Sequence, residues 1–129
     1  MGRVLLDTHV LLWTLLAPER LSDRVRVLVR DRRTTVLVSA VSAWEVATKH
    51  RLGQLPDASS VVSGYGDHLR RLGVEELPVT SPHALTAGSF EIEHRDPFDR
   101  VLAAQALHEG VQLATSDPAF AAFPCAVVW

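Results

Sequence analysis

The chain has 129 residues, of which 47% are hydrophobic, and a formal net charge of −2. This length supports one sizeable core but not two ordinary domains, so we expect a single domain over residues 1–129. The one cysteine, Cys125, excludes an intramolecular disulfide and a cysteine-based metal cluster. It fits a reducing cytoplasm.

No segment of the sequence is apolar over a length that spans a bilayer, and the apolar stretch over residues 10–17 is not followed by a signal-peptide cleavage site. We therefore expect a cytoplasmic protein with no membrane partner. The net charge argues against non-specific coating of nucleic acid. Six arginines nevertheless fall within fourteen positions, at Arg20, Arg24, Arg26, Arg30, Arg32 and Arg33. They form either a surface for phosphates or a solvated helix face.

Strands and helices alternate in the pattern of the first half of the chain. The predicted elements are a strand over 3–6, a helix over 8–17, a helix capped by Ser22, a strand over 36–38 and a helix from Ser39 to Gly53. The helix over 8–17 is apolar nearly all round, which predicts more than one face to bury.

The second half continues this alternation. Its predicted elements are a helix near 58–71, an edge strand over 75–79, a helix that begins at Ser81-Pro82, a loop over 90–95, a helix from Asp96 to Gly110, a strand over 111–114 and a last strand over 126–128. Repeated units of strand and helix predict an α/β fold with a short, mainly parallel sheet flanked by helices.

Four acidic residues, Asp7, Glu45, Asp99 and Asp117, lie at or near the points where a predicted strand is followed by a helix. In a parallel sheet these points share one edge, so the carboxylates are expected to converge there. Two unpaired carboxylates at about 4 Å repel by roughly 1 to 4 kcal/mol, whereas a helix cap contributes only about 1 kcal/mol. A site for Mg²⁺ or Mn²⁺ explains the gathering better than capping does.

Each acid also has a simpler interpretation. Asp7 and Asp117 are suitable helix caps, and Asp96 is the natural cap of the helix that follows it, which leaves Asp99 free. Glu45 has no capping role, and its alternative is a solvent-facing side chain. The six histidines show no paired ligand spacing, so we assign them to the surface or to local hydrogen bonds. No nucleophile elbow or glycine-rich phosphate loop is present.

Four segments in order, over residues 5–9, 39–46, 94–100 and 114–117, resemble the signature of a PIN domain. Within this family the chain is most similar to the VapC-type toxins of bacterial type II toxin–antitoxin pairs. The resemblance implies a three-layer α/β/α fold. It also implies that Asp7, Glu45, Asp99 and Asp117 are the catalytic and metal-binding residues, with Thr115 or Ser116 as a small hydroxyl beside them. Asp96 matches a motif residue that we expect not to contact the metal.

The implied activity is a Mg²⁺- or Mn²⁺-dependent endoribonuclease that cleaves specific single-stranded or loop RNA, such as transfer or ribosomal RNA. Water is the expected attacker, so the products carry a 5′-phosphate and a 3′-hydroxyl. Arg100 and the arginines between 20 and 33 are the candidates for contacts with RNA. The resemblance also implies a cognate antitoxin whose tail lies in a groove near the active site.

A homodimer is expected as well, because the helix over 8–17 is predicted to leave apolar surface uncovered. The alternative is that the second helix and the 58–71 segment cover it completely. Two other functions stay open: a catalytically silent PIN-like module that binds RNA or protein, and a receiver-like phosphoacceptor domain. The latter requires a lysine after a late strand, and the only lysine is Lys49.

Overall fold

A computed structural model describes residues 2–129 of the chain. Its elements in order are β1 (Arg3–Leu6), α1 (Thr8–Leu16), η1 (Pro18–Arg20), α2 (Asp23–Arg30), β2 (Thr35–Ser39), α3 (Ala40–Arg51), η2 (Pro56–Ala58), α4 (Ser59–Ser63), α5 (Tyr65–Leu72), β3 (Glu75–Leu77), α6 (Ser81–Ser89), α7 (Pro97–Glu109), β4 (Gln112–Ala114), η3 (Pro118–Ala122) and β5 (Val127–Val128). The predicted alternation of strands and helices is confirmed. Within residues 2–129, none of the helices has the length and apolar character needed to cross a membrane.

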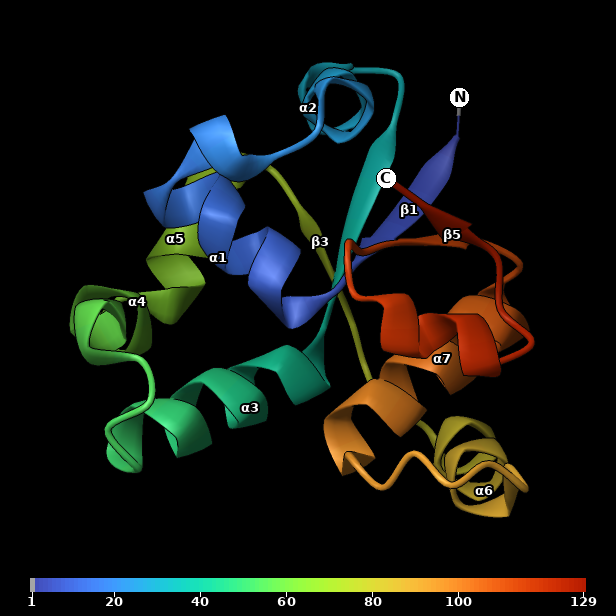
Figure 1. The fold of residues 1–129 in the computed structure, drawn as a ribbon. Coiled ribbons are helices and arrows are strands. Elements are labelled where there is room, and N and C mark those ends of the chain that lie inside the picture. Colours follow the sequence, from blue (N-terminus) through green and yellow to red (C-terminus); the bar gives the residue numbers. More distant parts are fainter. Residues whose placement is uncertain (1) are drawn as a thin grey trace.

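The five strands form one parallel sheet in the order β3-β2-β1-β4-β5. β1 lies at its centre, where Leu5 pairs with Leu37 of β2 and with Leu113 of β4. Figure 1 shows α1, α2 and α5 on one side of the sheet and α6 and α7 on the other. The predicted three-layer α/β/α fold is confirmed, and the carboxyl ends of all five strands lie at one edge.

Side chains alternate across the sheet and so divide the core in two. Leu5 belongs to a core that includes Leu102 of α7, whereas Val4 and Leu6 belong to a second core that includes Val25 of α2. All five of these side chains are at least 97% buried. Burial on both faces explains why the strands are continuous apolar runs in the sequence.

The apolar surface of α1 is mostly covered, contrary to the expectation of a broad uncovered face. Val10 and Leu11 are buried in the core shared with α2 and α5, and Leu12 packs with Val61 of α4. The alternative interpretation, in which α2 and the 58–71 segment cover this helix, is therefore largely correct. What remains is Leu16, whose exposed fraction is 47%.

One predicted helix differs from the structure and another is confirmed. The helix expected near 58–71 is two helices, because Gly64 leaves helical geometry with φ −118° and ψ 26°. The helix expected to begin at Ser81-Pro82 does begin at Ser81, and its cap is Thr80, whose backbone N–H donates to Nδ1 of His83 at 3.1 Å. His83 is buried, so it is a local structural residue rather than a surface one.

The loop over residues 90–95 is held by one side chain. The Arg100 guanidinium donates to the backbone carbonyls of Ala87 at 2.8 Å, Phe90 at 2.6 Å, Ile92 at 3.1 Å and His94 at 2.9 Å. Four charge-assisted hydrogen bonds on one planar group fix the path of the loop. The loop leads into the first turn of α7, which carries residues of the candidate site.

We predict that Arg100→Met lowers the free energy of unfolding by about 3 kcal/mol or more, because it leaves four carbonyls without their charged donor. Urea unfolding measures this change. Arg95→Met is the matched control, since Arg95 is exposed and has no hydrogen bond or ion pair within the described chain. A loss below about 1 kcal/mol in Arg100→Met would show that solvent replaces these bonds.

Candidate metal centre

A cavity of about 70 Å³ lies at the carboxyl edge of the sheet, between the starts of α1 and α7 and the middle of α3 (Figure 1). Its lining residues come from several segments distant in sequence: Asp7, Thr8, His9, Glu45, Lys49, Asp96, Asp99, Asp117 and Phe120. The fold thus brings all four predicted acids to one cavity. Such convergence is what the strand-end rule predicts.

Asp7 both caps α1 and lines this cavity. Its Oδ1 accepts from the backbone N–H of Val10 at 2.7 Å, and its Oδ2 accepts from the hydroxyl of Thr115. That hydroxyl oxygen also accepts from the N–H of Asp117 at 3.0 Å, so β1 and the end of β4 are tied together. Burial raises the pKa of Asp7, although the hydrogen bonds from Thr115 and Val10 oppose the rise. Thr115, rather than the exposed Ser116, is the hydroxyl in contact with an acid.

Glu45 is only 2% exposed, so the interpretation of a solvent-facing side chain is wrong. Its Oε2 accepts from Nζ of Lys49 at 2.5 Å, one helical turn later. Its Oε1 is buried and has no hydrogen-bond partner in the described chain. Burial acts to lower the pKa of Lys49, but Glu45, Asp96 and Asp99 outweigh it and raise that pKa. Lys49 therefore stays a cation beside the acids.

Asp99 lies next to His94, which the sequence assigned only to the surface or to local bonds. Nε2 of His94 is 2.8 Å from Oδ2 of Asp99, and the imidazole packs edge-to-face with Phe123 at a centroid distance of 5.4 Å. Burial raises the pKa of Asp99 to about 6; the bond from His94 opposes the rise and the carboxylates of Asp96 and Glu45 add to it. An ionised Asp99 only accepts hydrogen bonds, so Nε2 of His94 then carries the proton.

Asp96 lies closer to the acids than the sequence suggested. Carboxylate oxygens of Glu45, Asp96 and Asp99 lie within 4.8 Å of one another, a spacing that suits a shared cation. Oδ1 of Asp96 caps α7 by accepting from the N–H groups of Phe98 at 2.9 Å and Asp99 at 3.3 Å. Asp7 and Asp117 line the cavity outside this close trio. Asp117 is exposed and caps η3.

The donor set fits a hard divalent cation. Every acidic ligand candidate offers carboxylate oxygen, which is the ligand that Mg²⁺ and Mn²⁺ prefer. The buried Oε1 of Glu45 is an acceptor with no partner in the described chain, so it is free to bind a cation. Lys49 supplies one positive charge to a group of at least three carboxylates, so the site keeps a net negative charge that a cation would compensate.

The arginines expected around the rim lie elsewhere. Arg100 is committed to backbone carbonyls, and Arg20 lies over the Trp13 ring at 5.9 Å. α2 and the turn after it are at the opposite end of β2 from the cavity (Figure 1), which places the arginines over residues 24–33 far from the acids. Arg100 and the arginines over residues 24–33 therefore do not line the acidic cavity. The solvated-face alternative describes these arginines better.

The chain matches the PIN domain family over residues 4–124. The chain belongs to the PIN-domain family. This match spans nearly the whole sequence and removes the support for the receiver-like alternative.

Two curated relatives of this PIN domain are ribonucleases of Mycobacterium tuberculosis. Ribonuclease VapC22 is 31% identical over 120 residues, which cover 91% of this chain and 88% of that protein. Ribonuclease VapC16 is 41% identical over 61 residues, which cover 47% of this chain and 43% of that protein. The VapC16 match therefore spans less than half of the relative.

Solved structures show the same fold. VapBC2 from Rickettsia felis, bound to a DNA fragment from its promoter, contains a chain that aligns with a TM-score of 0.67 at 14% identity over 98% of this chain and 97% of that one. FitAcB from Neisseria gonorrhoeae gives a TM-score of 0.59 at 23% identity, with coverage of 98% and 96%. At these identities the likeness concerns the fold alone.

We predict that the metal-free protein loses stability as pH rises, and that Asp99 contributes to this loss. Its pKa of about 6 in the folded chain exceeds the ordinary 3.8, so the folded state binds this proton more tightly than the unfolded state. The contribution is complete below about pH 4 and disappears as pH rises through about 6. It amounts to at most about 3 kcal/mol, less after solvent screening. Urea unfolding in EDTA at about pH 5 and pH 7.5 measures it.

Asp99→Asn should reduce this pH dependence, whereas Asp23→Asn, at an exposed position on α2, should leave it unchanged. Millimolar Mn²⁺ should raise the melting temperature more at about pH 7.5 than at pH 5, because ligands must lose their protons. Glu45→Gln should shrink that rise. A melting temperature that Mn²⁺ leaves unchanged at both pH values would count against a metal site.

Proposed function

We propose that this PIN-domain nuclease is a Mg²⁺- or Mn²⁺-dependent endoribonuclease that acts as the toxin of a toxin–antitoxin pair. The observation that carries the proposal is the cavity lined by Asp7 at the start of α1, Glu45 of α3 and Asp99 of α7, with Oε1 of Glu45 buried and without a hydrogen-bond partner in the described chain. The kinship with ribonucleases VapC22 and VapC16 supports RNA as the substrate. When bound, the metal would orient the scissile phosphate and lower the pKa of a water molecule.

The protein residues have distinct tasks in this proposal. Asp7, Glu45 and Asp99 would hold the cation, and Asp117, at the cap of η3, would complete the site. Thr115 fixes the carboxylate of Asp7 by its hydroxyl. Pre-oriented ligands of this kind bind metal without a reorganisation cost at the moment of reaction.

Two more residues orient the ligands. His94 holds Oδ2 of Asp99, and Lys49 holds Oε2 of Glu45, so each acid is directed by a donor on its own or a neighbouring segment. Hydrogen bonds to acidic ligands of this kind set ligand orientation in metal sites. Because water is the attacking group, the 2′-hydroxyl of RNA takes no part, and cleavage leaves a 5′-phosphate and a 3′-hydroxyl.

The test is cleavage of a total transfer and ribosomal RNA preparation with Mn²⁺ or Mg²⁺, with and without EDTA. We predict that Asp7→Asn and Asp99→Asn lower the rate at least about a hundredfold while both variants stay folded, because asparagine caps helices as well as aspartate does. Asp23→Asn is the control. Full activity in both variants would refute the metal-site assignment.

Asp96 gives a finer test of the same site. Asp96→Asn should retain most activity, since asparagine preserves the cap of α7 and the proposal assigns the cation to Asp7, Glu45 and Asp99. A loss as large as that of Asp99→Asn would instead add Asp96 to the ligand set. A folded parent protein that neither binds Mn²⁺ nor cleaves RNA would favour the alternative of a silent module that only binds RNA or protein.

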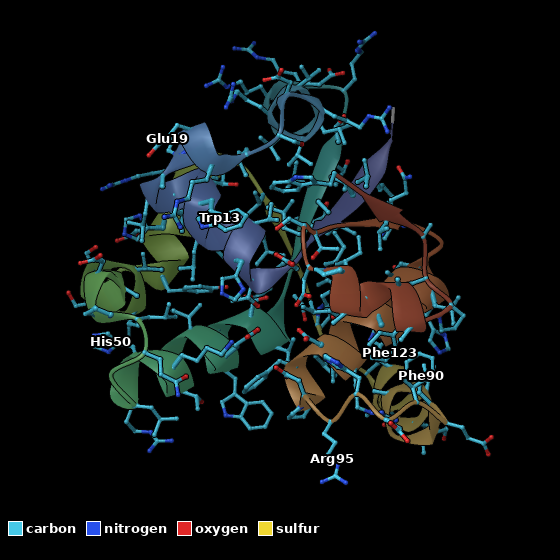
Figure 2. The ribbon with its side chains drawn as sticks, viewed as in Figure 1. Trp13, Glu19, His50, Phe90, Arg95 and Phe123 are labelled. Carbon is cyan, nitrogen blue, oxygen red and sulfur yellow. The ribbon has the colours of Figure 1, made fainter. Side chains whose placement is uncertain are left out.

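A second cavity, of about 710 Å³, suits the tail of an antitoxin. It lies between α1, η1 and the connection from α3 to α4, and is lined by His9, Leu12, Trp13, Leu16, Ala17, Glu19, Arg20, Gln54, Leu55, Pro56, Asp57 and Ala58. Figure 2 shows Trp13 and Glu19 on this side of the molecule. His9 lines both cavities, so a peptide in the larger one reaches the acids and can place a basic side chain there.

We predict a homodimer that also binds an antitoxin peptide; with α1 mostly covered, the ground for the dimer is the resemblance to VapC-type toxins. Light scattering at tens of micromolar should give twice the mass of one chain. Leu16→Asp should abolish co-purification with the antitoxin when the two are co-expressed, because it places a charge in the apolar part of the larger cavity. Val27→Asp is the control, at a position on α2 that is 67% exposed. A strict monomer, or unchanged co-purification of Leu16→Asp, would contradict the corresponding half of this proposal.

A further inference from the structure

Trp44 is an unusually exposed aromatic residue beside the acidic cavity. It precedes Glu45 on α3, yet its exposed fraction is 59% while that of Glu45 is 2%. Indole rings bury 150–250 Å² when they pack in a core, so leaving one in solvent forgoes a large hydrophobic gain. The core of this chain therefore does not explain the tryptophan.

The indole is nevertheless held in place. Its ring packs against Phe98 at a centroid distance of 4.7 Å and an interplanar angle of 81°. Such an edge-to-face contact leaves at least one face of the indole free of Phe98. Phe98 is buried in the first turn of α7, between the cavity residues Asp96 and Asp99. The contact thus anchors an open aromatic face at the junction of the two helices that carry the close acidic trio.

A cation follows on the same side of α3. Arg51 is seven residues after Trp44, which is close to two full turns and places both side chains on one helix face about 11 Å apart. Arg51 is exposed and has no ion pair or hydrogen bond in the part of the chain that the structure describes. Arg51 thus provides a positive charge on the same face of α3 as Trp44.

We propose that the exposed face of α3 defined by Trp44 and Arg51 binds the single-stranded RNA that leads away from the scissile phosphate. Trp44 stacks on a base, and Arg51 contacts a backbone phosphate. An aromatic platform with a cation nearby is how proteins hold single strands without reading their sequence. The inference rests on the proposed ribonuclease function, since it assigns the substrate path of that same site.

The test is fluorescence anisotropy with fluorescein-labelled single-stranded RNA, a 12-nucleotide oligo(U) or oligo(A), in Ca²⁺ in place of Mg²⁺ to slow cleavage. Trp44→Ala should weaken binding about tenfold, Trp44→Leu should behave like it, and Trp44→Phe should stay within about threefold of the parent protein. Leu85→Ala is the matched control, because Leu85 is an apolar side chain on α6 with an exposed fraction of 71%. Trp44→Leu keeps apolar bulk against Phe98, so its folding is secure if that of Trp44→Ala is not.

A second probe separates stacking from phosphate binding. With an abasic oligoribonucleotide of the same length, Trp44→Ala should bind as well as the parent, because no base remains to stack. Arg51→Ala should still weaken binding to this probe and should reduce the dependence of log K on log salt by about 0.7. A tenfold effect of Trp44→Ala that persists on the abasic probe would overturn the stacking role.

The outcomes also distinguish this inference from the proposed function. If the parent protein neither binds nor cleaves RNA with any divalent metal, the ribonuclease proposal itself fails. If the parent binds RNA and Trp44→Ala and Trp44→Leu bind it equally well, only the α3 platform is refuted. Unchanged RNA binding combined with lost antitoxin binding in these variants would likewise refute it and assign Trp44 to a protein interface.

Discussion

Repulsion among buried carboxylates is the constraint on which the rest of this site depends. Packing of three helix starts against the strand ends removes Asp7, Glu45 and Asp99 from most of the solvent. Burial raises the pKa of Asp7 and of Asp99, so the metal-free fold resists the charge that metal binding requires. Each carboxylate accordingly has a side-chain donor beside it: Thr115 for Asp7, Lys49 for Glu45 and His94 for Asp99. These donors keep the acids oriented, and a divalent cation would relieve the remaining repulsion.

Capping and metal binding are compatible uses of one carboxylate in this fold. Asp7 gives Oδ1 to the start of α1, and Asp96 gives Oδ1 to the start of α7, while both residues line the acidic cavity. The amino ends of helices carry partial positive charge, which favours acids at these positions. Helix starts that converge on a strand edge thus stabilise an acidic cluster before any cation arrives. The sequence analysis treated capping and metal binding as alternatives for Asp96. In this fold one carboxylate can have both roles.

The sequence predicted the scaffold of the site well and its supporting contacts poorly. Apolar runs and helix caps located the strands, and the strand-end rule placed Asp7, Glu45, Asp99 and Asp117 at one edge. His94 escaped notice because it lies in an irregular loop, where no periodicity indicates direction; its only signal was its place in the motif before Asp96. The pair of Glu45 and Lys49 was readable in principle, since residues four apart on a helix are neighbours. The sequence could not show how much of α1 is covered. The spacing of its apolar residues indicates which faces of the helix are apolar, but not which other helices pack on them.

The path of each helix decides which basic residues can assist the site. α1 and the segment after it carry the chain away from the carboxyl edge, and α2 lies at the amino end of β2, so the arginines of α2 are held away from the cavity (Figure 1). α3 instead runs along the carboxyl edge, and the return to β3 is left to α4 and α5 (Figure 1). A side chain far along α3, such as Arg51, therefore stays on the side of the site. Figure 2 shows Arg95 directed away from the body before α7, and Phe90 beside Phe123. A cluster of arginines in sequence was a weaker guide to function than the direction in which the helix that carries them runs.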